Sequence, residues 1–280
     1  MNRRRFVMLG LFGGGLSGRR ILGASKPEDE PIERRVPRRE LDPFHADNGG
    51  PSESRSVLDR LTFRSTMQWD PRLLEHTLDT VRYVRDWRRQ ISVLPPPANS
   101  SDRTQCELEL LRSYKSIRDR ETLLQIRKEV DPVAVILGDR PLGDYFSSRA
   151  HPATAELLRT AHGDLGPIVM TLKDEFDRVR PHKLSPDIEP VIDCPAHAAY
   201  PSGHSTQAHL VAAILSQIFP ARRLLFEQQA LAISIRREIA GVHYPSDTAA
   251  GASLAVQYLS FAQDHPSFSS LIEQAKKEWT

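Results

Sequence analysis

The sequence has few cysteines and no long apolar run, and each absence removes a class of protein. Its 280 residues include only Cys106 and Cys194, too few for a disulfide-built scaffold or a four-thiolate zinc site. The two thiols are either small buried hydrophobes or, in an exported protein, one bridge. No apolar stretch approaches the ~20 residues of a membrane-spanning helix, which excludes a polytopic membrane protein. The 38 Lys+Arg and 36 Asp+Glu nearly balance, so the charge gives no argument for a nucleic-acid partner.

The first part of the chain is predicted to be a signal and a linker. Residues 3–5 are all arginine and precede the apolar residues 6–12, an order that resembles a twin-arginine export signal over residues 1–25. The alternative is a frayed basic tail. We expect an exported protein, periplasmic or secreted, that begins near Ser25. Residues 26–69 are rich in Pro, Arg and Glu, and are predicted to be a linker or an arm laid over the domain.

Residues 70–280 are predicted to form a single all-α, helical-bundle domain. Asp70 and Pro71 are typical of a helix start, and apolar residues follow at helical spacing until the prolines at 95–97. Strand-like alternation bounded by turns is missing. A loop is expected around residues 138–145. Further helices are predicted over residues 101–130, 152–179 (bent near 163–167), 205–219, 221–240 and 245–262, with a short one near the C-terminus.

The first segment that suggests chemistry contains Lys173 and Arg180. Seven residues separate them, which is two helical turns, so a helix would present both on nearly one face. Pro181 disfavours helical geometry at Arg180 and would release that guanidinium toward a pocket. Taken alone, these charges could equally lie on a solvated face, with Lys173 paired to Asp177.

The second segment is the turn Ser202, Gly203 and His204, which leads into an apolar helix. A helix start presents unpaired N–H groups, a positive dipole end and here a hydroxyl, which together can bind an anion. His204 would stand beside that anion. The simpler alternative is an ordinary serine cap followed by a surface histidine.

The third segment contains Arg237, His243 and Asp247. Gly241 suits the end of one helix and Pro245 the start of the next, so His243 is expected in a tight corner. Asp247 lies within reach of one imidazole nitrogen, which would leave the other nitrogen free as a nucleophile or base. An isolated pair of this kind is more often structural.

Together the three segments resemble the signature of the type 2 phosphatidic acid phosphatase superfamily. That superfamily includes bacterial class A acid phosphatases, lipid phosphate phosphatases and vanadium haloperoxidases. Its pattern, K-x6-R-P, then P-S-G-H, then S-R-x5-H-x3-D, is matched over about residues 150–255 with one departure. Arg236 stands where a serine is expected, and the x5 spacing to His243 selects Arg237 as the family arginine.

The resemblance implies a helical fold of the acid phosphatase and vanadium haloperoxidase type, and a role for each matched residue. Lys173, Arg180 and Arg237 would neutralise phosphate oxygens, and Ser202 and the Gly203 amide would add hydrogen bonds. His243 would attack phosphorus, Asp247 would orient it, and His204 would protonate the leaving alcohol and then activate water. No metal is required, because three cations stabilise the charge.

Three functions are compatible with these residues. The leading one is a metal-independent phosphomonoester hydrolase that acts on a small phosphorylated substrate. The second is a haloperoxidase that holds vanadate, otherwise an inhibitor, as a cofactor in the same pocket. The third is a non-catalytic phosphate-binding domain, which would not need the set His204, His243 and Asp247.

The other histidines near these segments are not expected to bind a metal. His197, His209 and Asp193 flank the second segment, but the i,i+5 step from His204 to His209 spreads the rings around a helix. His182, Lys183, His197 and Tyr200 are interpreted as rim residues of the pocket or as plain surface residues. Cys194 is expected to be structural or bridged.

Overall fold

The part of the chain that is described is helical. A computed structural model describes residues 57–129 and 149–280, and all of them belong to the unit that spans residues 38–280. Every regular element within those two ranges is an α-helix or a 3₁₀ helix, and none is a strand. The prediction of an all-α fold is therefore confirmed. The export signal and the loop at 138–145 lie outside the described residues.

The helices differ widely in length. Four long ones build the centre of the fold: α7 (Pro152–Phe176), α9 (Gly203–Ile218), α10 (Arg223–Ile239) and α11 (Pro245–Ala262). The other α-helices are α1 (Phe63–Thr66), α2 (Pro71–Glu75), α3 (Trp87–Gln90), α4 (Asp102–Ser113), α5 (Arg120–Lys128), α8 (Pro181–Leu184) and α12 (Pro266–Lys277). The 3₁₀ helices are η2 (Val57–Arg60), η3 (His76–Leu78), η4 (Tyr114–Ile117) and η6 (Pro220–Arg222).

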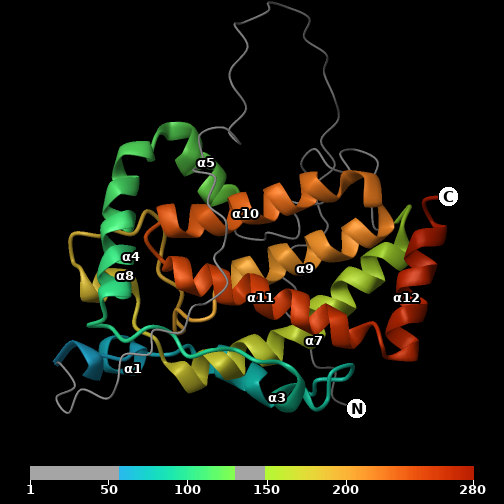
Figure 1. Cartoon of the computed structure of the whole chain (residues 1–280), viewed down its shortest axis with the longest axis horizontal. Helices are drawn as coiled ribbons and strands as arrows, with labels where there is room; N and C mark the ends of the chain where they lie inside the picture. Colours follow the sequence, from blue (N-terminus) through green and yellow to red (C-terminus); the bar gives the residue numbers. More distant parts are fainter. Residues whose placement is uncertain (1–56, 130–148) are drawn as a thin grey trace, which may run out of the picture. The chain divides into compact units, whose positions relative to one another are not determined.

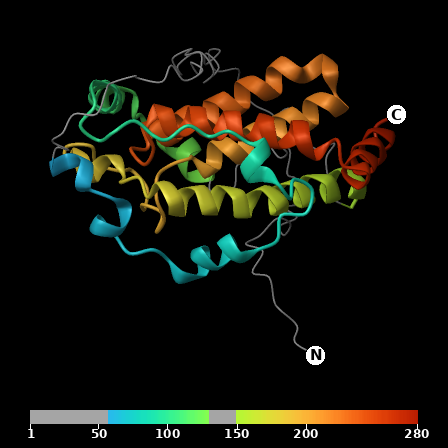
Figure 2. The same cartoon turned by 60° about the horizontal axis from the view of Figure 1, so that its bottom comes forward.

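Helix α9 lies at the centre and packs against α10 and α11 (Figure 1). Helix α7 contacts α9 and α12, and the segment with α2 and η3 runs along its other side (Figure 2). The shared core is apolar and buried, and burial of such side chains supplies most of the driving force for folding. Its members include Leu165, Ile168 and Leu172 of α7, Leu210 and Ile214 of α9, Ile233 of α10 and Tyr258 of α11.

Helix α7 ends three residues before the predicted boundary at 179. Asp177 caps it in the left-handed conformation, with φ of 43°, and its amide donates to the Lys173 carbonyl over 3.0 Å. The helix continues through Pro167, whose ring is buried and whose missing amide removes one backbone hydrogen bond. Arg180 then precedes α8 in an extended conformation, as Pro181 requires.

The helix predicted from residue 70 toward the prolines at 95–97 is wrong. It stops after η3, and only the four residues of α3 return to helix. The reason lies on α7, where the buried Asp164 carboxylate accepts the amides of Arg82 and Tyr83, the latter over 3.1 Å. At residues 82–83 these bonds replace the backbone hydrogen bonds that a helix would make.

The helix predicted over 101–130 is also divided, into α4, η4 and α5. Asp119 caps α5 by accepting the Thr122 amide over 2.8 Å. Arg118, between η4 and α5, has a non-helical backbone conformation, and its side chain donates to the Ile239 carbonyl over 2.9 Å. Of the predicted linker or arm, residues 57–69 are described and lie against the domain. Phe63 is fully buried there, and its amide donates to the Asp177 carbonyl over 2.7 Å.

Candidate functional site

Three segments that are far apart in the sequence meet at the start of α9. The Ser202 amide donates to the Asp247 carbonyl of α11 over 2.9 Å. A Cβ atom placed on Gly203 would lie 4.0 Å from Lys173 Cε, near the end of α7. The fold therefore brings the three motif segments together.

Two of the predicted cations are buried and bound to neutral oxygen atoms. Lys173 Nζ donates to the carbonyls of residues 198–199 at 2.9 and 3.2 Å. Arg180 donates from Nη1 to the Val242 carbonyl over 2.7 Å and from Nη2 to the His197 carbonyl over 2.8 Å. Burial lowers the pKa of Lys173 well below its usual value, with a further contribution from Arg180. Among the described residues neither side chain forms an ion pair with a carboxylate, so an incoming anion would not have to displace one.

The third cation, Arg237, lies against the end of α5. Its Nη2 donates to the Ile126 carbonyl and to Glu129 Oε2, each over 2.9 Å. Arg236, which stands where the family has a serine, pairs with the other oxygen of the same carboxylate over 2.5 Å. The Arg237 Nε is buried and has no hydrogen-bond partner among the described residues, so it is a donor left for a further acceptor.

Ser202 is the N-cap of α9, and its hydroxyl accepts the Ser205 amide over 3.4 Å. The first amides of such a helix have no partner within it, so they point toward any anion at this end. The backbone of Ser202 packs closely against α11. A Cβ atom on Gly251 would lie only 2.6 Å from the Ser202 carbonyl oxygen, so only glycine at this position lets the start of α9 come so near to α11.

His243 and Asp247 form the predicted pair. His243 Nδ1 lies 3.1 Å from Asp247 Oδ2, which also accepts the Tyr244 amide over 3.0 Å. Burial raises the pKa of Asp247, but the Arg178 charge and the His243 bond outweigh it and bring that pKa to about 2. An ionised carboxylate only accepts hydrogen bonds, so His243 carries its hydrogen on Nδ1.

The other nitrogen of His243 faces a cation. Arg180 Nη1 lies 3.2 Å from His243 Nε2, so the guanidinium donates to the bare nitrogen. Burial, followed by the Arg180 charge, lowers the pKa of His243 well below its usual value. A neutral imidazole with a free lone pair on Nε2 is the nucleophilic form.

His204 is neutral as well. Its Nε2 lies 3.0 Å from the Glu129 carbonyl oxygen and donates to it. Burial and the nearby Arg237 lower the pKa of His204 to about 3. A general acid must carry a proton, so this ring must gain one before it can serve a leaving group.

The interpretation of Tyr200 as a rim or surface residue is wrong. Tyr200 is fully buried, and its hydroxyl donates to the Leu94 carbonyl over 2.5 Å. His197 Nδ1 lies 3.2 Å from Arg180 Nη2. His182 lies 3.5 Å from the Cys194 sulfur, and both cysteines are free thiols. Within residues 57–129 and 149–280 no group of three His, Cys, Asp or Glu side chains could hold a metal ion.

Four side chains beside the site were not foreseen from the sequence: Glu107, Glu129, Arg178 and Ser246. Arg178 lies inside the variable stretch of the first motif, where its neighbours give no signal that it faces inward. Glu107 is a charged residue on α4 that is only 6% exposed. Nothing in the sequence around it indicates that its side chain is buried.

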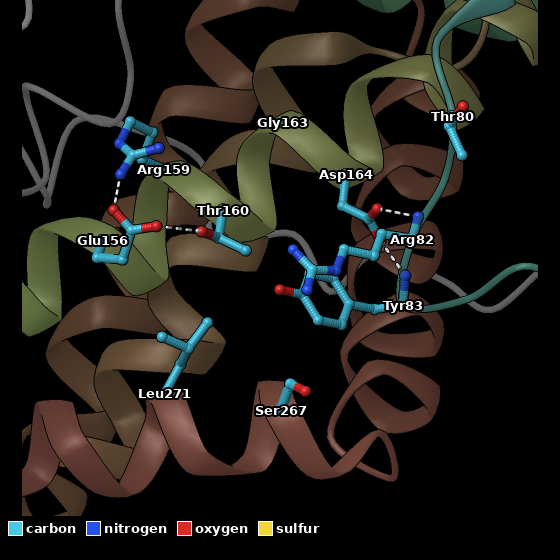
Figure 3. A pocket seen from close by; sticks show the side chains of 10 residues that line it. All are labelled: Thr80, Arg82, Tyr83, Glu156, Arg159, Thr160, Gly163, Asp164, Ser267 and Leu271. Atoms are coloured by element: carbon cyan, nitrogen blue, oxygen red, sulfur yellow. Dashed lines mark hydrogen bonds and ion pairs between the residues drawn. The ribbon is translucent and has the colours of Figure 1, made fainter.

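A separate pocket of about 470 Å³ lies elsewhere, between α7, α12 and the segment at 80–83 (Figure 3). It shares no residue with the site. Its buried carboxylate, Asp164, already accepts two amides and the Tyr258 hydroxyl, the latter over 3.0 Å. Arg159 in its wall pairs with Glu156 (Figure 3).

Comparison with known proteins gives a family match for part of the chain. Residues 160–263 match the family model of the PAP2 superfamily, a segment that contains every motif residue from Lys173 to Asp247. This segment is thus similar to the PAP2 superfamily. No match was found among curated protein sequences. In the described part of the protein, none of the helices has the length and apolar character required to cross a membrane.

Two solved structures resemble this chain. A bacterial vanadium-dependent iodoperoxidase superposes with a TM-score of 0.52 at 16% identity, and the likeness covers 73% of this chain and 61% of that one. That match shows a common fold, and the chain spans about three fifths of the iodoperoxidase's length. A transmembrane PAP2-type phosphatidylglycerolphosphate phosphatase from Bacillus subtilis gives a TM-score of 0.44 at 18% identity, covering 59% of this chain and 87% of that one.

Proposed function

We propose that this protein is a metal-independent phosphoric monoester hydrolase that acts through a phosphohistidine on His243. The observation that carries the proposal is the state of that ring. Nδ1 faces the ionised Asp247 at 3.1 Å, which leaves Nε2 with a lone pair beside Arg180. A structural histidine needs no such arrangement, whereas a nucleophile requires it.

The proposed substrate is a small phosphate monoester. Its phosphoryl oxygens would be bound by Lys173, Arg180 and Arg237, with the Ser202 hydroxyl and the Gly203 amide as neutral donors. The phosphate would take over the Arg180 N–H that now points at His243 Nε2. The anion therefore both binds the cations and frees the nucleophile.

His204 takes up a proton when the dianionic substrate binds. In the first step, His243 Nε2 bonds to phosphorus and the ester P–O bond breaks. The leaving alkoxide takes the proton from His204, and Asp247 stabilises the charge that develops on the His243 ring. In the second step, His204 accepts a proton from water, the resulting hydroxide bonds to phosphorus and the P–N bond breaks. The products are an alcohol and inorganic phosphate, and both histidines return to the states they have in the substrate complex.

Two other functions use the same residues. The cations and His243 would also suit vanadate, which when bound would activate peroxide for halide oxidation. A phosphate-binding domain would use the cations alone. One paired assay separates the three: hydrolysis of an aryl phosphate with chelator present, and halide oxidation by peroxide after vanadate loading. We expect hydrolysis that vanadate inhibits, and tight phosphate binding without turnover would instead favour the binding domain.

The two histidine roles are tested by trapping the phosphoenzyme. We expect His243→Ala to abolish both turnover and an acid-labile, alkali-stable phosphoenzyme, because the attacking nitrogen is gone. His204→Ala is expected to lose about 10²–10⁴-fold in rate, and less for a nitrophenyl ester, whose leaving group needs little protonation. His162→Ala, an exposed histidine on α7, is the matched control. Loss of the phosphoenzyme in His204→Ala but not in His243→Ala would reverse the assignment.

We also propose that the protein is exported, on the strength of the arginines at 3–5 and the apolar residues after them. N-terminal sequencing of protein from its native host tests this. A first residue near Ser25 in a non-cytoplasmic fraction is expected, and an intact Met1 in the cytoplasm would contradict it.

A further inference from the structure

A buried arginine outside the motif binds the free oxygen of Asp247. Arg178 Nη1 lies 2.6 Å from Asp247 Oδ1 and 2.6 Å from the Ser246 hydroxyl. Its guanidinium also stacks over the Tyr244 ring, 3.9 Å from the centroid. The Arg178 side chain is 1% exposed, so it is held in one position and has little contact with solvent.

A second carboxylate, from α4, completes this arrangement. Glu107 Oε2 accepts Arg178 Nη2 over 3.2 Å, and Glu107 Oε1 accepts the Ser246 amide over 2.8 Å. Ser246 also donates its hydroxyl to Oε2 over 2.9 Å. Glu107 therefore fixes the guanidinium and the first turn of α11, the turn that carries Asp247.

The charge of Asp247 depends on the charge of Arg178. Asp247 is fully buried, so an ionised carboxylate there is stable only if nearby groups compensate for the lost hydration. Without the Arg178 guanidinium on Oδ1, much of that compensation would be lost. Such a group protonates or turns toward another donor. Either change removes the fixed acceptor for His243 Nδ1–H, and with it the preference for a bare Nε2.

We infer that Arg178 and Glu107 are positioning residues for the reaction: they hold Asp247 in place and ionised, so that Asp247 can orient His243. The inference rests on the proposed function and deepens it. Neither residue touches the place where the phosphoryl group would bind; both act through Asp247. Glu107 lies on α4, outside the segment at 160–263 that matches the family model. The residues that hold Asp247 in place therefore come from more of the chain than the motifs do.

The kinetic test uses Arg178→Met, Arg178→Lys and Glu107→Gln, with Arg112→Met as the matched control. Arg112 also pairs with an aspartate, Asp187, over 2.8 Å, but on the surface. For Arg178→Met we expect kcat to fall about 10²-fold, the usual cost of a misplaced catalytic group. The inhibition constant of inorganic phosphate should change little, since the cations that bind it remain. Arg178→Lys should recover part of kcat, and Arg112→Met should behave as wild type.

A double-mutant cycle separates this role from general damage to the fold. If Arg178 acts through Asp247, then adding Arg178→Met to Asp247→Asn should lower kcat much less than it does in the wild type. Additive losses, or an Arg178→Met variant with nearly unchanged kcat, would overturn the inference. So would equal losses in kcat and phosphate affinity, because they indicate a collapsed site.

The tautomer of His243, measured by 15N NMR, gives a readout that needs no turnover. In the wild type the hydrogen should be on Nδ1, which faces Asp247 Oδ2 at 3.1 Å, and Nε2 should be bare. Arg178→Met should increase the share of the tautomer with its hydrogen on Nε2, because Asp247 is no longer a fixed acceptor, and Glu107→Gln should do so to a smaller extent. Arg112→Met should keep the wild-type tautomer, and an unchanged tautomer in Arg178→Met would contradict the inference.

The two readouts keep the hypotheses distinguishable. If the wild type hydrolyses no phosphate ester, the proposed function fails, and the tautomer of His243 still tests the positioning role. If the wild type is active and the tautomer of His243 is the same in Arg178→Met, the function stands and the positioning role fails.

Discussion

The two histidines of the site differ in what they need before they can react. His243 is already a neutral nucleophile in the free protein, because burial and Arg180 lower its pKa well below the usual value. His204 has a pKa of about 3 and lacks the proton that a general acid donates. A bound dianion would place two negative charges beside this ring and raise its pKa. The substrate itself therefore supplies the electrostatic condition for proton donation.

We predict that binding of a dianion takes up a proton at His204. Sulfate is the useful probe, because it remains a dianion over the pH range in which phosphate changes its own charge. The relevant pH range lies between the pKa of His204 in the free protein and its pKa in the sulfate complex. In that range the affinity for sulfate should rise as the pH falls, since His204 is protonated in the complex but not in the free protein. Calorimetry in buffers of different ionisation enthalpy measures the uptake near pH ~5.

The control for this uptake is His204→Ala, which should bind sulfate with less proton uptake than the wild type. Identical uptake in the two proteins would assign the proton to another group, such as His243, and contradict the prediction.

At the scale of helices, the contact between α9 and α11 sets the position of the anion-binding turn. Gly251 of α11 faces the first turn of α9, and a Cβ atom there would lie 2.6 Å from the Ser202 carbonyl and 2.9 Å from Thr206 Oγ1. Backbone cannot yield as a flexible side chain can. The two helices must therefore separate if any side chain is added at Gly251.

We predict that Gly251→Ala destabilises the protein by about 1–3 kcal/mol, the usual cost of overpacking, and also weakens phosphate binding. The matched control is Gly163→Ala on α7, where a Cβ atom meets nothing within 4 Å. That variant should gain up to about 1 kcal/mol, because alanine favours the helix. Chemical denaturation and phosphate binding measure both effects. A neutral Gly251→Ala would show that α9 and α11 can shift without cost.

The helices that sequence could place are those with local signals at their ends. Proline begins α7 and α11, Ser202 caps α9, and Gly241 ends the turn after α10 with φ of 76°. The stretch after η3 could not be placed, because its amides bond to Asp164, about 80 residues further along the chain. No pattern within a helix-length window contains that partner.

The same limit applies to the site. The spacing of Lys173, Arg180, His243 and Asp247 carried the motif and could be read directly from the sequence. Arg178 could not be separated from the solvated charges around it, because its burial depends on Glu107 from a helix about 70 residues earlier. Long-range ion pairs of this kind emerge only once the fold is formed.

Across the described molecule, five buried or half-buried histidines have a lowered pKa. Burial lowers the pKa of His182, His197, His204, His209 and His243 below the value of 6.5 that an exposed histidine has. The unfolded chain takes up protons on all five as the pH falls below 6.5, whereas the folded protein takes them up only at lower pH. Folding and the chemistry of the site are thus linked through the same groups.

We therefore predict that the protein loses stability as the pH falls below about 6.5. A group with a depressed pKa contributes fully above its unfolded value, and the contribution declines toward the folded pKa, at roughly 1.4 kcal/mol per pH unit for each histidine. Urea denaturation across this range should show the free energy of unfolding falling with pH. His209→Asn, which keeps a donor for the Ser205 carbonyl, should reduce the slope by about one proton. Stability that rises toward acid pH would show that these histidines are already charged in the folded protein.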